Sequence, residues 1–297
     1  MRKLKVILEM IKFEHTVFAL PFAFLGAILG SFVENGAWPT LWQWIWITVA
    51  MVGARSAAMS LNRVIDAVID KRNPRTKDRA IPAGLLSYTE VTIFIVVSFA
   101  MLFIAAFQLN MLAVYLLPLA VFFLVLYSYT KRFTWACHFI LGMTIALAPL
   151  GGWSGATGTI SPVAILLFLV VMFWTAGFDI IYATQDADYD RKNGLHSVPA
   201  RFGIKKALMI ARGSHVISII ALVLLSLTSP LGWIFFLGAM ICAGIMIYEH
   251  SLVSHNDLSK VNVAFFTMNG IISMLMLAFT IGDFMLRTKI SARLQSQ

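Results

Sequence analysis

Two polar segments with the same spacing of aspartates interrupt a chain that is otherwise apolar. The first, NRVIDAVIDKRN, places carboxylates at Asp66 and Asp70, and the second, YATQDADYDRKN, places them at Asp186 and Asp190. In each copy an asparagine or a tyrosine precedes the first aspartate by four residues, and two cations and an asparagine follow the second aspartate. Two matching copies indicate a shared chemical task, whereas one copy alone would equally suit a solvated helix end.

Residues four apart lie on one face of an α-helix, so each copy predicts a polar stripe at a helix end. The two stripes consist of Asn62, Asp66 and Asp70, and of Tyr182, Asp186 and Asp190. Four carboxylates at a membrane edge repel one another unless a cation lies between them. Carboxylate oxygens suit Mg²⁺, which commonly bridges to substrate phosphates. We therefore expect both stripes to face one vestibule that binds Mg²⁺ and a diphosphate.

Several cations have positions that suit a diphosphate site. Arg72, Lys131 and Arg191 follow apolar runs near the aspartates, and we expect them to hold phosphate oxygens that the metal does not neutralise. Arg55 lies seven residues before Asn62 inside an apolar run, where an arginine is costly and normally faces a cavity or a partner. The chain has no glycine-rich nucleotide loop, so ATP is not indicated.

The composition describes a membrane protein. The chain has 297 residues, of which 60% are hydrophobic and only 12% are charged, which does not suit a soluble surface. Nine apolar runs approach the length of about 20 residues that a helix needs to cross a bilayer. They cover about residues 16–33, 41–62, 88–107, 110–128, 135–153, 160–182, 211–228, 231–249 and 262–285. No run alternates with period two, so we expect an all-α, polytopic bundle forming one domain over residues 1–297.

The charges fit a membrane topology better than a nucleic-acid site. The net charge is +9, but the cations gather between alternate apolar runs rather than on one face. The rule that cationic loops stay inside predicts a cytoplasmic N-terminus and cytoplasmic loops at about 63–87 and 183–210, the loops that carry the aspartates. The two copies are 120 residues apart, a distance that includes four helices, which favours an internal duplication. Only the tail cations Arg287, Lys289 and Arg293 violate the rule, which makes the ninth span the weakest prediction.

The paired motifs on a nine-helix chain resemble the UbiA superfamily of intramembrane prenyltransferases, whose best known members are 4-hydroxybenzoate polyprenyltransferases. The resemblance covers nearly the whole chain. It implies a polyprenyl diphosphate donor, an aromatic acceptor, Mg²⁺, a multi-pass cell-membrane location and no nucleic-acid partner. It also implies Mg²⁺ and diphosphate roles for Asn62, Asp66, Asp70, Asp186 and Asp190. Lys131, in Tyr-x-x-x-Lys-Arg, and Tyr182 would lie close to the diphosphate, and Arg55 matches the arginine that the family carries seven residues before its asparagine.

The resemblance leaves the acceptor open. 4-Hydroxybenzoate, in quinone biosynthesis, is the expected acceptor, but the first helix has Lys12-Phe13-Glu14-His15-Thr16 where hydroxybenzoate enzymes tend to carry an arginine-containing stretch. This segment resembles the branch linked to the futalosine route to menaquinone. Naphthoate, homogentisate, haem or a sugar phosphate are further acceptors within the superfamily. Glu14 and His15 would either contact the acceptor or lie at the membrane interface.

Two readings of Asp179 and two other functional classes stay open at this stage. Asp179, one turn deeper than Tyr182, would either act on the acceptor, by polarising it or taking its proton, or make a helix-packing hydrogen bond. A membrane carrier also has repeats and intramembrane charge, but its charges usually lie near the bilayer midplane rather than at helix ends. A structural scaffold would need no intact aspartates.

Overall fold

A computed structural model describes residues 2–11 and 13–295, and it describes side chains except those of residues 2, 4, 13–19 and 290–295. Glu14 and His15 therefore lie outside the described side chains. The described chain is helical and contains no strand, which confirms the predicted all-α class. Its helices are α1 (Arg2–Met10), α2 (Phe13–Asn35), α3 (Leu41–Ile65), α4 (Ala67–Arg72), α5 (Tyr88–Leu109), α6 (Met111–Thr130), α7 (Cys137–Thr157), α8 (Pro162–Ala183), η1 (Thr184–Asp186), α9 (Ala187–Lys192), α10 (Val198–Phe202), α11 (Ile204–Thr228), α12 (Trp233–Glu249), η2 (Val263–Met268) and α13 (Asn269–Gln295).

The predicted spans match the long helices of the bundle. Seven helices in the described part of the chain are long and apolar enough to cross a membrane, and α2 and α12 contain shorter apolar stretches. Most of the predicted ends agree within a few residues, but α11 begins at Ile204 instead of residue 211. Its first two turns carry Lys205 and Lys206, which broke the apolar run in the sequence. The helices form the multi-pass membrane bundle that was expected.

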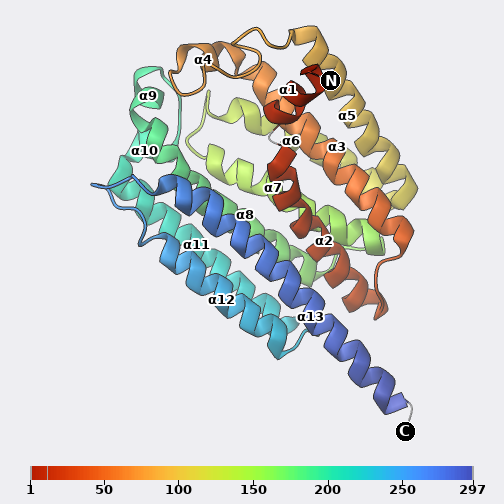
Figure 1. Cartoon of the computed structure of the whole chain (residues 1–297). Coiled ribbons are helices and arrows are strands. Elements are labelled where there is room, and N and C mark those ends of the chain that lie inside the picture. The colour runs from red at the N-terminus through yellow and green to blue at the C-terminus, as the bar shows by residue number, and fades with distance from the viewer. Residues whose placement is uncertain (1, 12, 296–297) are drawn as a thin grey trace.

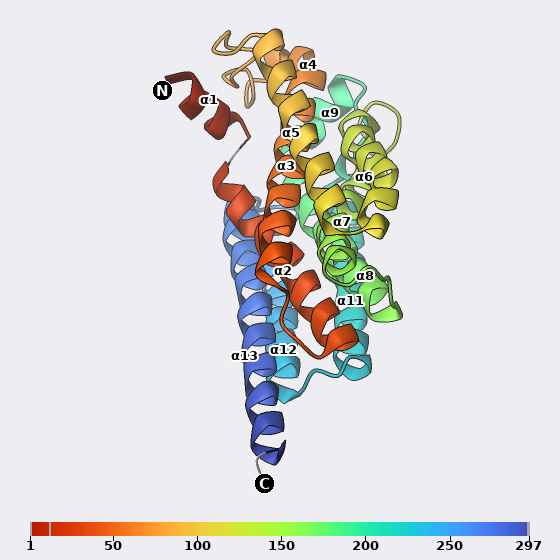
Figure 2. The same cartoon turned by 90° about the vertical axis from the view of Figure 1, so that its right-hand side faces the viewer.

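The two motif loops lie at the same end of this bundle, which we call the motif end. Figures 1 and 2 show α4 and α9 together with α1 at this end, while the C-terminus of α13 lies at the opposite end. The two loops belong to helices that run in the same direction through the bundle. This arrangement brings segments separated by 120 residues to one layer.

The ninth helix, which was the least certain from the sequence, is well anchored. Asp283, at 1% exposure, accepts hydrogen bonds from the backbone N–H of Gly232 at 2.8 Å and from Arg287 Nε at 3.1 Å. Arg287 therefore has a local partner within α13, and Asp283 binds a free N–H at the start of α12. One of the tail cations is explained by this contact rather than by membrane topology.

Glycines allow α2 and α7 to approach closely. A Cβ atom on Gly26 would lie 2.0 Å from the carbonyl oxygen of Pro149, and one on Gly152 would lie 2.0 Å from that of Ala23. Small residues at helix crossings are the usual means of packing helices in a bilayer, where no hydrophobic effect drives them together. This contact fixes one wall of the cavity described below.

Candidate active site

Each motif breaks its helix at the central aspartate. Asp66 (φ −91°, ψ 2°) separates α3 from α4, and Asp186 (φ −102°, ψ 3°) separates η1 from α9. The prediction of a polar stripe on one continuous helix is therefore wrong in detail. The first stripe nevertheless keeps its face, because the N–H of Asp66 still donates to Asn62 O at 2.9 Å and that of Asp70 to Asp66 O at 2.7 Å. The central aspartates of both copies have nearly the same backbone conformation, but the second copy passes through the 3₁₀ turn η1 before α9 begins.

All four motif aspartates are paired with cations. The pairs are Asp66 with Arg132 (3.4 Å), Asp70 with Arg79 (2.7 Å), Asp186 with Arg75 (2.5 Å) and Asp190 with Lys131 (3.4 Å). Asp70, Asp186 and Asp190 are buried, and Asn62 Nδ2 also donates to Asp66 at 2.9 Å. Buried carboxylates need such partners because an isolated charge in a low dielectric is very costly.

The two motifs are joined directly. Arg75, from the loop after α4, donates through Nε and Nη2 to both oxygens of Asp186, and its Nη1 lies 3.4 Å from the Tyr182 hydroxyl. Tyr189, in α9, donates its hydroxyl to Ile69 O in α4 at 3.2 Å. These contacts agree with the expectation that both stripes face one vestibule. We call this set of paired side chains the charged layer; it consists of Asp66, Asp70, Asp186 and Asp190 with Arg75, Arg79, Lys131 and Arg132.

Two groups of this layer, Asp66 and Lys131, have raised pKa values for different physical reasons. Burial, assisted by the nearby charge of Asp70, raises the pKa of Asp66. Burial also opposes the charge on Lys131, but the nearby acidic groups together outweigh that effect, Asp190 most of all, so the pKa of Lys131 is raised and its ammonium is retained. Each aspartate of the layer has a cationic partner. The raised pKa of Asp66 shows that further positive charge beside it would stabilise its ionised form.

A large cavity of about 1220 Å³ opens beneath the charged layer. Arg75 and Arg79 line its motif end, while leucines and alanines of α3, α5 and α6 line the rest of its length as far as Leu109. Along α3 the cavity-lining residues include Ala50, Ala54 and Ala58, spaced four apart on one face. The cavity is therefore polar at one end and apolar along most of its length.

One wall of the cavity is a continuous series of aromatic rings. Successive ring centroids lie 4.1 to 5.3 Å apart along it. The series runs Phe22, Trp174, Phe178, Phe265 and Tyr182. Phe265 comes from η2, a π-helix, a conformation that frequently marks functional sites. Aromatic faces attract cations, so this wall suits a positively charged intermediate.

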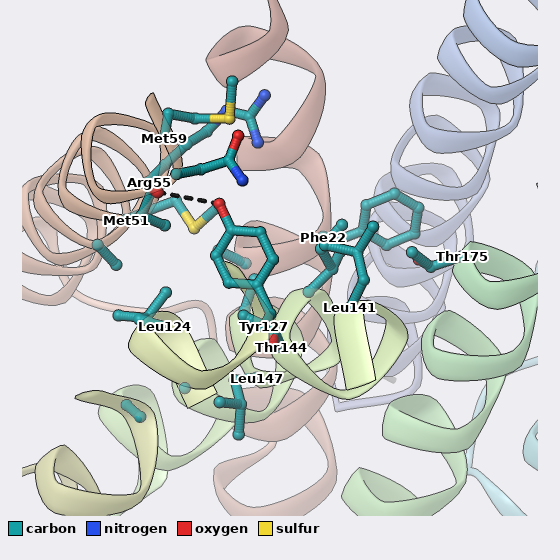
Figure 3. Close-up of a pocket in the computed structure, with 18 of the residues that line it drawn as sticks. Phe22, Met51, Arg55, Met59, Leu124, Tyr127, Leu141, Thr144, Leu147 and Thr175 are labelled. Atoms are coloured by element: carbon teal, nitrogen blue, oxygen red, sulfur yellow. Dashed lines mark hydrogen bonds between the residues drawn. The ribbon is translucent and has the colours of Figure 1, made fainter. Parts of the chain in front are cut away.

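Arg55 lies inside the cavity as the sequence predicted. Figure 3 shows it beside Met59 and Tyr127, whose hydroxyl donates to Ala58 O at 2.9 Å. The Nε atom of Arg55 is buried and has no hydrogen-bond partner among the described residues. A buried guanidinium with an unused donor can bind an anionic group that enters the cavity.

Asp179 also lines the cavity, at the border between the charged layer and the aromatic wall. Its Oδ2 lies 2.6 Å from Nδ1 of His138, a fully buried side chain at the start of α7. A helix-packing hydrogen bond was one of the two interpretations of Asp179, but no pattern in the sequence identifies His138 as the partner, because the two residues are 41 positions apart on different helices.

Two predicted phosphate ligands lie away from this site. Arg72 is exposed on the outer side of α4 beside Lys71 and Tyr88, and Arg191 pairs with the exposed Asp188 at 3.3 Å. Arg75, Arg79 and Arg132 contact the motif aspartates instead, and they were missed. The loop after α4 turns back over the site, so residues farther from Asp70 in sequence are closer to it in space.

The carboxylates fit a metal that takes few protein ligands. Within the described residues, no group of three histidine, cysteine, aspartate or glutamate side chains converges to hold a metal alone. Mg²⁺ usually takes one or two carboxylates and completes its coordination with water and substrate phosphates. Asp66 with Asp70 and Asp186 with Asp190 supply two pairs of carboxylates beside the cations of the same layer, and such pairs match that preference.

Comparison with known sequences identifies relatives of matching length. The chain is 27% identical over 245 residues to a 4-hydroxybenzoate octaprenyltransferase of Vibrio atlanticus (strain LGP32), covering 78% of this chain and 86% of that protein. It is 29% identical over 250 residues to the enzyme of the same name from Aliivibrio salmonicida (strain LFI1238), with the same coverage.

Comparison with solved structures finds the same fold. The apo structure of a UbiA homolog from Aeropyrum pernix K1 superposes with a TM-score of 0.83 at 31% identity, covering 91% of this chain and 98% of that one. A UbiA homolog from Archaeoglobus fulgidus, solved bound to GPP and Mg²⁺, has a TM-score of 0.70 at 19% identity, covering 94% and 99%. The model of the UbiA prenyltransferase family matches residues 20–271, and the chain belongs to this family.

Proposed function

We propose that this prenyltransferase moves a polyprenyl group from an allylic polyprenyl diphosphate to an aromatic acid, 4-hydroxybenzoate, with release of diphosphate. The observation that carries the proposal is the position of the charged layer. Arg75 and Arg79 line one end of a largely apolar cavity and pair there with Asp186 and Asp70. The paired Asp66 and Asp190 belong to the same charged layer, and the cavity contains the guanidinium of Arg55 with an unused donor. This arrangement offers separate sites for diphosphate, prenyl chain and aromatic carboxylate.

The diphosphate site is assigned to the charged layer. Arg75, Arg79 and Lys131 carry the positive charge that phosphate oxygens need, whereas Arg72 and Arg191, which were expected to contribute, lie outside this site. Asp66, Asp70, Asp186 and Asp190 would hold Mg²⁺, which would supply further charge stabilisation for the departing diphosphate. On binding, the arginines exchange a carboxylate partner for a phosphate partner, which preserves their charge-assisted hydrogen bonds.

The allylic cation and the prenyl chain are assigned to the apolar part of the cavity. The small side chains of α3 leave room for a long chain, and the aromatic wall excludes water from the cation while its ring faces stabilise it. Tyr182 contacts both regions, because its hydroxyl lies near Arg75 and its ring stacks on Phe265.

The acceptor is assigned to the space between Arg55 and Asp179. Arg55 binds the carboxylate of the acid, Asn62 lies about two turns further along α3, and Asp179 accepts the proton that the ring loses on substitution. The same site takes another aromatic acid equally well, so a menaquinone-pathway acceptor of the futalosine or naphthoate type is the alternative. In the cell membrane we place the N-terminus and both motif loops on the cytoplasmic side, from the charge asymmetry.

The test uses detergent-purified protein with Mg²⁺, a long-chain allylic diphosphate and a panel of aromatic acids, with products detected by mass. We expect product from 4-hydroxybenzoate, loss of product on chelation, and a fall of about 100-fold or more in Asp66→Asn and Asp186→Asn. Asp188→Asn is the matched control, since Asp188 lies in the same loop but is 87% exposed and contacts only Arg191 among the described residues.

The outcomes separate the alternatives. Product only from another aromatic acid moves the enzyme to a different pathway and keeps the site assignments. Equal loss in Asp188→Asn and Asp186→Asn contradicts a specific role for the motif. Absence of product and of diphosphate release with every acceptor overturns the proposed function.

A further inference from the structure

A buried histidine holds Asp179, a carboxylate that lines the cavity beside the aromatic wall. His138 is fully buried, and its two ring nitrogens have different partners: Asp179 Oδ2 lies 2.6 Å from Nδ1, and the backbone N–H of Val198 lies 3.3 Å from Nε2. Asp179 itself is partly exposed, at 22%, because it borders the cavity. The histidine is thus closed to solvent while its partner is open to substrate.

The hydrogen bonds define the tautomer of His138. A backbone N–H can only donate, so Nε2 must accept from Val198 and the ring proton must lie on Nδ1. That proton is donated to Asp179 Oδ2. A donated hydrogen bond favours the ionised form of a carboxyl group and restricts its rotation. Among the described residues nothing donates to the other oxygen of Asp179, Oδ1.

We propose that His138 is a positioning residue for prenyl transfer, which holds Asp179 as an oriented carboxylate whose Oδ1 accepts the proton of the acceptor ring. The inference rests on the proposed function. In the step concerned, the bond between the allylic carbon and the diphosphate oxygen breaks with its electron pair on oxygen, and a ring carbon forms a bond to that allylic carbon. The proton on the substituted ring carbon passes to Asp179, and its electron pair restores the aromatic ring.

The surroundings of His138 support a fixed geometry. Val198 is the first residue of α10, in the loop that follows the second motif. Two residues earlier, the N–H of His196 donates to the backbone oxygen of Lys131 at 2.7 Å, and Lys131 pairs with Asp190. The short segment 196–198 is therefore held between His138 and the charged layer. Asp179 is aligned with respect to the motif aspartates through hydrogen bonds rather than through packing alone.

Two amide substitutions separate the positioning role from a packing role. The amide nitrogen of asparagine occupies about the place of Nδ1 in histidine, and that of glutamine occupies about the place of Nε2. His138→Asn therefore retains a donor toward Asp179, whereas His138→Gln retains only a group near Val198, and His138→Leu retains neither. We expect kcat to fall about 10- to 100-fold in the Leu and Gln variants and much less in the Asn variant. Asp179→Asn should lower kcat at least as far, and KM for the prenyl diphosphate should change little in all four.

His215 provides the matched control. It is also a buried histidine on a long helix, and its Nε2 contacts the backbone oxygen of Trp174 at 3.2 Å, but its Nδ1 faces His250 rather than a carboxylate. It does not line the cavity. The Asn and Gln variants of His215 should have equal kcat values. A difference between the Asn and Gln variants that occurs at His138 and not at His215 therefore reflects the contact with Asp179 rather than a general loss of folded protein.

Rates with an acceptor deuterated at the substituted ring carbon give an independent readout. With 4-hydroxybenzoate, or whichever acceptor of the panel the wild type uses, we expect deuterium to slow His138→Gln more than the wild type, because proton removal becomes slower. Equal kcat in the Asn and Gln variants, or a higher kcat in the Gln variant, overturns the role of His138 while the proposed function stands. A wild type that forms no product overturns both.

Discussion

Arg75 links the two aspartate motifs by donating two hydrogen bonds, of 3.0 and 2.5 Å, to the carboxylate of Asp186, which lies 111 residues away in the sequence. The arginine comes from the loop after the first motif, and the aspartate is the central residue of the second. Arg79 of the same loop binds Asp70. The loop therefore neutralises one carboxylate of each motif while it lines the mouth of the cavity, where it would meet a diphosphate.

Arg75→Gln should weaken diphosphate binding and also lower stability. The arginine is 38% exposed, so solvent screens the pair, but Asp186 is buried and loses its cation, and we expect a loss of stability of about 1 to 3 kcal/mol. Loss of a charge-assisted contact to phosphate should raise KM for the prenyl diphosphate about 10-fold or more. Initial rates over a range of diphosphate concentrations measure this effect. Arg191→Gln is the control, and an equal rise in its KM would contradict the assignment.

Arg55→Met should separate acceptor binding from stability. The variant loses hydrogen bonds between a charged donor and the acceptor carboxylate, worth about 1.5 to 3 kcal/mol, so KM for the acceptor should rise about 10- to 100-fold. The unfolding temperature should not fall, because Arg55 has a buried donor without a partner among the described residues and its burial is costly. Kinetics with each substrate varied in turn make the measurement.

Arg201→Met serves as the comparison for Arg55→Met, since the guanidinium of Arg201 lies over the rings of Trp135 and Phe202 outside the cavity. It should leave both KM values unchanged. If Arg55→Met raises KM for the prenyl diphosphate and not for the acceptor, Arg55 belongs to the diphosphate site and its assignment here is wrong.

Gly26→Ala should destabilise the crossing of α2 and α7. Its Cβ atom would lie 2.0 Å from a backbone oxygen of Pro149, which cannot move without shifting α7, and such overpacking costs about 1 to 3 kcal/mol. Gly213→Ala, in α11, meets nothing within 4 Å and should stabilise the helix by up to about 1 kcal/mol. Unfolding temperatures in one detergent compare the two, and a neutral Gly26→Ala would contradict the close approach.

The fold was largely predictable because the bilayer imposes it. A helix that crosses a membrane needs a long apolar run, and such runs stand out wherever loops carry the charges. The start of α11 shows the limit, because Lys205 and Lys206 are helical and yet interrupt the apolar run. The motif aspartates were also identifiable, since their spacing repeats and carboxylates are rare in such a chain.

The partners of those aspartates were not predictable, because they depend on how a loop returns over the site. Arg72 is the nearest arginine to Asp70 in that loop, but α4 turns its side chain outward, and Arg75 and Arg79 beyond the helix end make the contacts. The aromatic wall is drawn from three separate parts of the chain, and its members other than the motif residue Tyr182 look like ordinary lipid-facing residues in the sequence. The contact of His138 with Asp179 likewise exists only in the packed bundle.

Acid should destabilise the protein through His250, which lies just after α12. Burial and the charge of Arg212 lower the pKa of His250 to about 4, from an ordinary value of about 6.5. Below about pH 6.5 the unfolded chain gains a proton on this residue while the folded protein does not, until the pH approaches 4. The free energy of unfolding should therefore fall as the pH decreases through that window.

His250→Gln, which keeps a polar group near His215 but cannot titrate, should lose less stability between pH 7 and pH 5. Unfolding temperatures of both proteins across that range make the comparison, and identical slopes would show that His250 is protonated in the folded state or contributes nothing.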